Sequence, residues 1–292
     1  MWGIIFILVI AAAISGFIYL ISRFARFKFI DKASKSRKSV KILLSIVIVI
    51  LITGIIWLSM GYVNAIICML HLAIFWLVFD LISSIIKKYR KKDFKLYYAG
   101  ILTIAFTVIY LSAGWYFAHH VSPTHYIIET NKEVDSLRIV FFADSHIGAT
   151  FNADGFSQHI KSIQNEKPDI VLITGDYIDD DTSKEDMIKC CELLGTLDTT
   201  YGVYFSFGNH DKGYYDEKYR GYNGDDLIYE LTRNGVIVLQ DESILIDDTF
   251  YVIGRQDFSE TEKGSSRASM EDLMNGLDTD KFIIVMDHQP HD

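Results

Sequence analysis

The chain has 292 residues, 50% of them hydrophobic, and a formal net charge of −9. Residues 1–118 hold 14 of the 28 basic side chains but only three of the 37 acidic ones, a net +11, which leaves −20 for residues 119–292. The acidic C-terminal part argues against nucleic acid as a partner, because binding to phosphate backbones needs clustered lysine and arginine. Three cysteines, Cys68, Cys190 and Cys191, show no disulfide framework.

The first 118 residues predict a membrane anchor of four transmembrane helices. Four mainly apolar segments occupy residues 1–22, 40–60, 63–86 and 96–118. Each has about 20 residues or more, which is enough to cross a hydrocarbon core about 30 Å thick. The first segment is not typical of a cleaved signal peptide, because its positive charges follow the apolar run instead of preceding it. We therefore expect this part of the protein to contact the lipid bilayer.

The charges of the loops predict the orientation of this anchor. Lysine and arginine gather in the loops around residues 23–41 and 87–95, whereas the turn at Gly61-Tyr62 carries no charge. The positive-inside rule then places both basic loops in the cytoplasm and both chain ends outside it. His71 and Asp80 lie nine residues apart within the third segment, on opposite helix faces, and we expect each to form hydrogen bonds between helices.

After a linker at residues 119–136, the sequence alternates between strand and helix patterns. Strands are predicted at 138–142, 170–174, 202–207 and 236–239, and helices at 155–165, 184–197 and 225–233. A hairpin of 244–246 and 250–253, turning at Asp247-Asp248, and a strand at 282–286 complete the pattern. This order predicts an α/β sandwich with a mixed sheet.

Four short polar motifs follow predicted strands. They are Asp144-Ser145-His146, Gly175-Asp176-Tyr177-Ile178-Asp179, Gly208-Asn209-His210-Asp211 and Asp287-His288-Gln289-Pro290. Open α/β sheets place their sites beyond the carboxyl ends of strands, so these motifs should converge on one edge. Each motif alone would be no more than a turn or a solvated loop. Together they supply carboxylate, amide and imidazole ligands without thiolate, a set that suits Mn²⁺, Fe or Zn²⁺.

The order of these motifs resembles the calcineurin-like metallophosphoesterase superfamily, and the last motif and the membrane-attached amino terminus are similar to its bacterial YkuE-like branch. The resemblance covers residues 137–292. It says nothing about the four predicted helices, and it implies that the region after them is a phosphoesterase α/β sandwich with mixed sheets. It also implies two divalent metal ions: Asp144 and His146 would bind one, Asp176 would bridge both, and Asn209 with His288 would bind the second. A bridging carboxylate suits two ions about 3.5–4 Å apart.

The reaction implied by the resemblance is hydrolysis of a phosphomonoester, phosphodiester or pyrophosphate by a metal-bridged hydroxide. His210 would protonate the leaving oxygen or stabilise the transferring phosphoryl group, and Asp211 would orient His210. Asp179 would hold the loop or one of the ligands. Gly175 and Gly208 should permit close backbone turns at the metals. Because we expect the domain to be tethered outside the cytoplasm beside the bilayer, a lipid-linked phosphate ester is a candidate substrate. Soluble nucleotides are the alternative, because tethering can equally retain an enzyme at the cell surface.

The superfamily pattern closes with Gly-His-x-His, which does not follow His288 before Asp292. We therefore expect a partial domain with weak metal retention, an exposed sheet edge and low activity. The alternative function is that of a non-catalytic membrane protein whose degenerate phosphoesterase domain binds a phosphorylated ligand or partner. The full set of Asp144, His146, Asp176, Asn209, His210 and His288 opposes this alternative.

Overall fold

The computed structural model describes residues 2–92, 94–214, 217–262 and 264–291, and the chain divides into two compact units, Met1–Ala118 and His119–Asp292. The first unit is helical. Its elements are α1 (Trp2–Phe24), α2 (Lys28–Ala33), α3 (Lys38–Arg90) and α4 (Tyr98–His119). Within the described residues, α1, α3 and α4 are long and apolar enough to cross a membrane.

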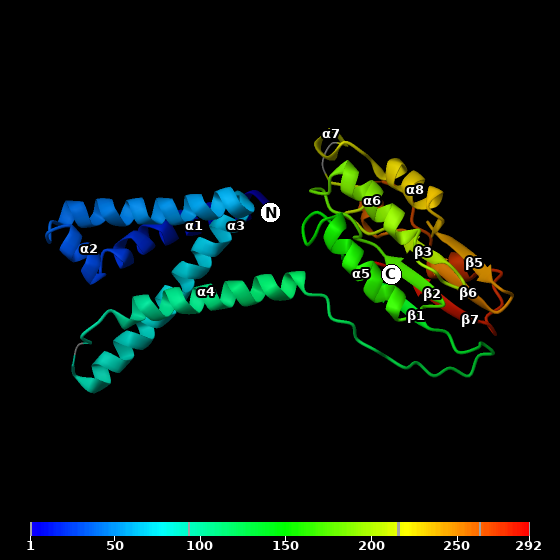
Figure 1. Ribbon diagram of the computed structural model, residues 1–292, viewed down its shortest axis with the longest axis horizontal. Helices are drawn as coiled ribbons and strands as arrows, with labels where there is room; N and C mark the ends of the chain where they lie inside the picture. Colours follow the sequence, from blue (N-terminus) through cyan, green and yellow to red (C-terminus); the bar gives the residue numbers. More distant parts are fainter. Residues whose placement is uncertain (1, 93, 215–216, 263, 292) are drawn as a thin grey trace. The chain divides into compact units, whose positions relative to one another are not determined.

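The prediction of four separate spanning helices is not confirmed, because the predicted second and third spans both belong to α3, which has 53 residues. Gly61 interrupts this helix with non-helical angles, φ 83° and ψ 165°, and Figure 1 shows α3 bending there. A straight helix of this length would extend about 80 Å, far more than a hydrocarbon core of about 30 Å. The bend therefore separates two arms that are each long enough to cross.

Asp80 of α3 connects the helices of the first unit. Its carboxylate accepts hydrogen bonds from the hydroxyls of Tyr19 in α1 (3.1 Å) and Tyr97, just before α4 (3.2 Å). Arg23 Nε lies 2.9 Å from the same carboxylate. The predicted bonding between helices is thus confirmed for Asp80. His71 differs, because its Nδ1 lies 2.8 Å from a carbonyl of its own helix.

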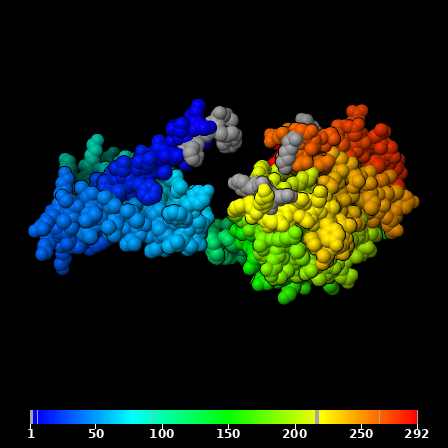
Figure 2. All heavy atoms as spheres, turned by 90° about the horizontal axis from the view of Figure 1, so that it is seen from above, coloured from blue at the N-terminus to red at the C-terminus, as the bar shows by residue number. Residues whose placement is uncertain are grey.

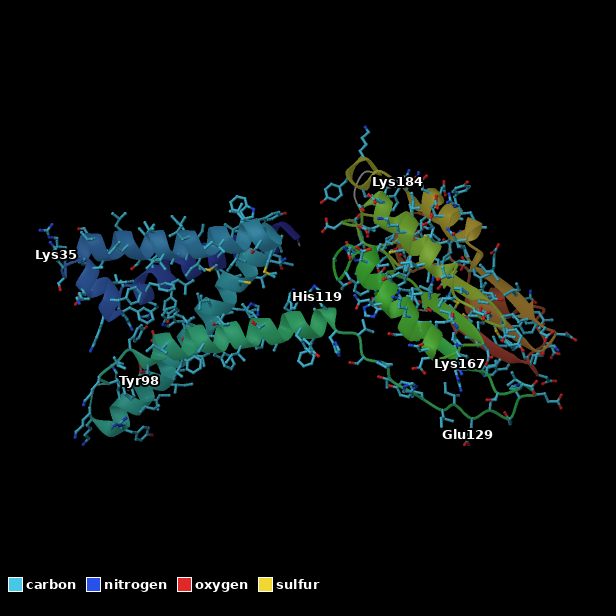
Figure 3. The ribbon with its side chains drawn as sticks, in the orientation of Figure 1. Lys35, Tyr98, His119, Glu129, Lys167 and Lys184 are labelled. Atoms are coloured by element: carbon cyan, nitrogen blue, oxygen red, sulfur yellow. The ribbon has the colours of Figure 1, made fainter. Side chains whose placement is uncertain are left out.

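The second unit begins with an extended segment that carries Glu129 (Figure 3) and leads into a parallel sheet. Within the described residues this sheet has the order β1-β2-β3-β4. Its strands are β1 (Ile139–Phe142), β2 (Ile170–Thr174), β3 (Val203–Ser206) and β4 (Val236–Val238). The connecting helices α5 (Ala153–Asn165), α6 (Lys184–Leu194) and α8 (Gly224–Arg233) each begin at a side-chain cap: Asn152, Ser183 and Asn223.

A second sheet of order β5-β6-β7 contains β5 (Glu242–Ile246), β6 (Phe250–Gly254) and β7 (Phe282–Met286). β5 pairs with β6 antiparallel and β6 with β7 parallel, so the predicted mixed pairing is confirmed but confined to this second sheet. The structure also contains three short helices that were not predicted from the sequence: α7 (Glu217–Arg220), α9 (Ser259–Glu262) and α10 (Met270–Met274).

The central strands of the parallel sheet, β2 and β3, are buried on both faces. Val171, Ile173 and Phe205 pack on the side of the helices, where they share a core with α5, α6 and α8. Leu172 and Tyr204 point to the other side and share a core with the second sheet. Helices and two sheets therefore form successive layers, and Figure 2 shows the green, yellow and orange atoms of this unit packed together.

Candidate metal centre

The four polar motifs lie at one edge of the sheets. Asp144, Asp176 and Asn209 follow the carboxyl ends of the parallel strands β1, β2 and β3. β7 of the second sheet ends beside them, because Nδ1 of His288 lies 2.9 Å from the carbonyl oxygen of Thr174, the last residue of β2. The packing of the two sheets thus brings the last motif to the first three.

Three of the predicted metal ligands have a left-handed backbone, which is uncommon for residues other than glycine. Asp144, His146 and Asp176 have φ angles of 54°, 40° and 49°. The conformation costs roughly 1–2 kcal/mol per residue. Hydrogen bonds between the loops hold it in place: the Asp144 N–H donates to the Gly175 carbonyl (3.1 Å) and the His146 N–H to the Asp176 carbonyl (3.0 Å). Such strain is typical of functional sites.

Two glycines allow the loops after β2 and β3 to touch. Gly175 has φ 74°, and a Cβ atom on it would overlap the backbone of Gly208. A Cβ atom on Gly208 would in turn overlap Asp176. The prediction that these glycines permit close backbone approach is confirmed.

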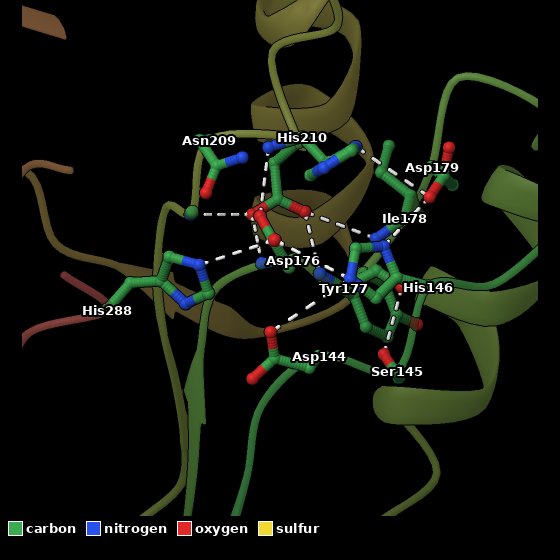
Figure 4. Close-up of polar contacts among 12 residues, drawn as sticks. Asp144, Ser145, His146, Asp176, Tyr177, Ile178, Asp179, Asn209, His210 and His288 are labelled. Carbon is green, nitrogen blue, oxygen red and sulfur yellow. Dashed lines mark hydrogen bonds and ion pairs between the residues drawn. The ribbon is translucent and has the colours of Figure 1, made fainter. Parts of the chain in front are cut away.

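The carboxylate of Asp176 lies between two histidines. Its Oδ2 is 3.6 Å from Nε2 of His146 and 3.3 Å from Nε2 of His288, and Figure 4 shows the two rings on opposite sides of it. Asp144 Oδ1 lies 3.9 Å from Nε2 of His146. Ligand atoms that share one ion are about 3–3.5 Å apart when each lies about 2.1 Å from the metal. Asp176 is therefore placed to serve ions on both sides.

Both histidines are held with Nε2 toward the centre. Nδ1 of His146 lies 2.8 Å from Oδ2 of Asp179, and Nδ1 of His288 bonds to a backbone carbonyl. Metal-binding histidines usually have such a partner on the second ring nitrogen, which fixes the orientation of the ring. The hydrogen bond with Asp176 raises the pKa of His288 to about 9. Burial raises the pKa of Asp176, but hydrogen bonds from His288 and from the His210 N–H outweigh it and lower that pKa.

Asn209 lies beside Asp176, with the His288 ring nearby (Figure 4). Its Oδ1 accepts a hydrogen bond from Gln289 Nε2 (2.9 Å) and its Nδ2 donates to the Tyr214 hydroxyl (2.5 Å). The structure therefore brings together Asp144, His146, Asp176, Asn209 and His288, which are the predicted ligands. Ligand atoms of Asp144, Asp176 and His288 all lie within 4.8 Å of one another.

The predicted pairing of Asp211 with His210 is wrong. The Asp211 side chain is fully buried and accepts hydrogen bonds from the backbone N–H groups of Asp176, Tyr177, Ile178 and Gly208, at 2.7–3.1 Å. Burial raises its pKa to about 7 against the opposing effect of these donors. The carboxylate that faces the His210 ring is Asp179, whose Oδ2 lies 3.7 Å from Nδ1. Asp211 instead fixes the loop that carries Asp176.

Comparison with known proteins identifies the fold. The sequence profile of the calcineurin-like phosphoesterases matches residues 137–292, more than half of the chain. The chain belongs to this family. Phosphoesterases of this family use divalent metals, and the convergence of carboxylate, imidazole and amide groups around Asp176 fits that use.

Its relatives among the calcineurin-like phosphoesterases include membrane proteins. An uncharacterized metallophosphoesterase of Campylobacter jejuni is 25% identical over 76% of this chain and 58% of its own length. The metallophosphoesterase YkuE of Bacillus subtilis is 28% identical over 44% of this chain and 46% of its own. A transmembrane protein with a metallophosphoesterase domain from Danio rerio is 27% identical over 55% and 36%. The chain thus spans about half the length of these relatives.

This phosphoesterase domain contains four further side chains that we did not predict from the sequence. Tyr214 and Gln289 bond to the Asn209 amide, as described above. Arg255 and Arg267 both bind Asp287, the residue before His288, at 3.1 and 2.6 Å. A signal existed for Arg255, because a cation directly after the apolar strand β6 lies at the same edge as the motifs. Tyr214 lies in a polar loop where no sequence pattern distinguishes it.

Proposed function

We propose that this protein is a membrane-attached hydrolase that uses two divalent metal ions to cleave a phosphomonoester, phosphodiester or pyrophosphate. One observation carries the proposal: two histidines from distant segments direct Nε2 at the same Asp176 oxygen, each with Nδ1 held by an acceptor. A purely structural ion pair needs one histidine, whereas a carboxylate shared by two ions would have a ligand on each side. The family supports the same reaction class.

The donor set indicates how the ions would be held. Asp144, His146 and Asp176 would hold one ion, and Asp176, Asn209 and His288 the other. Oxygen and imidazole ligands suit Mn²⁺, Fe or Zn²⁺. When bound, such ions supply Lewis-acid charge stabilisation and an activated water for attack on phosphorus.

His210 is placed to act as the general acid. Its N–H donates to Asp176 Oδ1 (2.8 Å), which fixes the residue beside the proposed bridging carboxylate. Its ring packs edge-on against the His146 ring, with centroids 4.8 Å apart. The carboxylate of Asp179 lies 3.7 Å from Nδ1 of His210, and we propose that the His210 imidazole delivers a proton to the leaving oxygen.

We also propose that the centre lies outside the cytoplasm. Support comes from the basic loops on either side of the α3 arms, which the positive-inside rule assigns to the cytoplasm, and from the bend at Gly61. A tethered domain in that location would meet phosphate esters at the membrane surface, including lipid-linked ones. The transmembrane homologue from Danio rerio supports the membrane attachment.

The test is hydrolysis of bis-p-nitrophenyl phosphate and p-nitrophenyl phosphate by the full chain in detergent with added Mn²⁺. We expect turnover that disappears in D176N, because the ions lose their shared carboxylate. In H210A we expect kcat to fall by about 10²–10⁴-fold, the usual contribution of a general acid. H125A is the matched control, because His125 is an exposed histidine of the extended segment.

The outcomes separate the proposed function from its alternative. Turnover that persists in D176N and H210A would contradict the proposal. Binding of Mn²⁺ that depends on Asp176, without turnover of either ester, would favour a non-catalytic domain that binds a phosphorylated ligand.

A further inference from the structure

Tyr214 contacts two residues of the metal centre, although it belongs to none of the four motifs. It lies in the loop after β3, five residues beyond Asn209. Its ring packs edge-on against the His210 ring, with centroids 4.9 Å apart. Its hydroxyl oxygen accepts a hydrogen bond from Asn209 Nδ2 at 2.5 Å. More than half of the side chain is exposed, so burial alone does not explain its position.

The backbone around Tyr214 holds the ring in this place. The Tyr214 N–H donates to Oδ1 of Asp180 (3.0 Å), and the N–H of Gly213 donates to the His210 carbonyl (2.8 Å). Gly213 has φ 81°, and a Cβ atom on it would lie 2.9 Å from the guanidinium carbon of Arg220. Arg220 is buried and bonds to the Asp211 carbonyl (3.0 Å), so it cannot move aside freely. The loop after β3 therefore folds back, so that Tyr214 lies against Asn209 and His210 of the motif that precedes it.

The hydrogen bond from Asn209 matters because the two ends of an amide differ chemically. The oxygen end accepts hydrogen bonds and binds metal ions, whereas the nitrogen end can only donate. Rotation of the Asn209 amide by 180° would direct its NH₂ group where a ligand oxygen is needed. Tyr214 binds the nitrogen end and Gln289 Nε2 bonds to the oxygen end at 2.9 Å. One lone pair of Oδ1 remains for an ion.

We propose that Tyr214 is a positioning residue: its hydroxyl holds the Asn209 amide in the orientation that presents Oδ1 to a metal ion. This role rests on the proposed function, because it assumes that Asn209 is a metal ligand. Tyr214 lies outside the four motifs and would act by orienting the metal ligand Asn209, without contacting the ion itself. Removing such partners of metal ligands typically weakens metal binding by 10–100-fold.

The test compares Mn²⁺ dissociation constants, measured by equilibrium dialysis of the full chain in detergent, for wild type, Y214F and Y219F. We expect Y214F to weaken Mn²⁺ binding by about 10-fold or more, because the amide loses the acceptor for its nitrogen end. Y219F is the matched control. Tyr219 is similarly exposed, and its hydroxyl makes a hydrogen bond away from the centre, by donating to the carboxylate of Asp181. We expect its Mn²⁺ affinity to equal that of wild type.

A double-mutant cycle with N209D separates orientation from a general effect on the fold. A carboxylate has two equivalent oxygens, so its orientation does not depend on Tyr214. We therefore expect Y214F to change Mn²⁺ affinity less than about 3-fold in the N209D background. Equal losses in both backgrounds, or wild-type affinity in Y214F, would overturn this role alone. Wild-type protein that binds no Mn²⁺ would overturn the proposed function and this role with it.

Discussion

Asp176 connects the parts of the centre at the scale of single residues. One carboxylate oxygen faces His146 and His288, and the other accepts the N–H of His210. Its own N–H bonds to Asp211, which is fully buried. The position of one side chain thus depends on hydrogen bonds and ion-pair contacts with three motifs. A substitution in any of these motifs should therefore affect the metal centre, either through the stability of the fold or through the orientation of a ligand.

Replacing Asp211 and Asp179 by asparagine should have different effects: the first should lower stability and the second should lower turnover. In D211N the new NH₂ group would face backbone N–H groups that now donate to the carboxylate, and two buried donors would lose their acceptor. We expect the free energy of unfolding to fall by about 2–5 kcal/mol at pH 8. In D179N we expect kcat to fall by at least about 10-fold, because His146 and His210 lose a carboxylate partner.

Differential scanning calorimetry in detergent, together with p-nitrophenyl phosphate turnover, measures both effects; tryptophan fluorescence would not, because all four tryptophans lie within residues 1–118. The two variants serve as controls for each other, because each exchanges one carboxylate for an amide. A D211N protein that keeps the wild-type Tm and loses only turnover would restore the role that we first assigned to Asp211.

At the scale of elements, two arginines hold the segment after β7. Arg255 follows β6 directly, and Arg267 lies between α9 and α10. Both side chains are buried and both contact Asp287, the residue before His288. Arg267 also donates to the backbone carbonyls of Gln256, His291 and Gln289. The planar guanidinium group serves these acceptors at once, which an ammonium group cannot do.

R267K tests this arrangement while keeping the charge. We expect the Tm to fall and Mn²⁺ binding to weaken by about 10-fold, because the segment that carries His288 loses most of its hydrogen bonds. Differential scanning fluorimetry and equilibrium dialysis provide the measurements. R138K is the control, because Arg138 is partly exposed and its guanidinium bonds to the Glu166 carbonyl, away from the centre. If R267K and R138K behave alike, the guanidinium geometry is irrelevant to His288.

The sequence predicted the strands and the ligands for one physical reason. Apolar runs such as β2 are continuous because both faces of the strand are buried, and the polar residues that follow mark the edge of the sheet. The short helices α7, α9 and α10 escaped prediction because four or five residues have no periodicity to detect. The role of Asp211 escaped because its N–H donors belong mostly to the loop after β2, far away in the sequence.

At the scale of the whole molecule, the candidate substrates depend on the side of the membrane on which the centre lies. The native thiols allow a direct test. Cys190 and Cys191 are fully buried in the helix α6, and burial raises the pKa of the Cys190 thiol to about 12 and also raises that of Cys191. Thiolate is the reactive form, so both should resist maleimide reagents. Cys68 of α3 is partly exposed and would be replaced by serine in both variants, so that a cysteine introduced at an exposed position stands out from the background.

We expect S122C to react with a membrane-impermeant maleimide on intact cells and S39C to react only after lysis. Ser122 lies in the exposed segment after α4, and Ser39 lies in the basic region at the start of α3. The positive-inside rule assigns the latter to the cytoplasm, because translocating a cluster of lysine and arginine is unfavourable. The two substitutions are matched, since each exchanges an exposed serine for cysteine without changing charge. Labelling of S39C but not S122C on intact cells would place the phosphoesterase domain in the cytoplasm, and the candidate substrates would then be cytoplasmic phosphate esters.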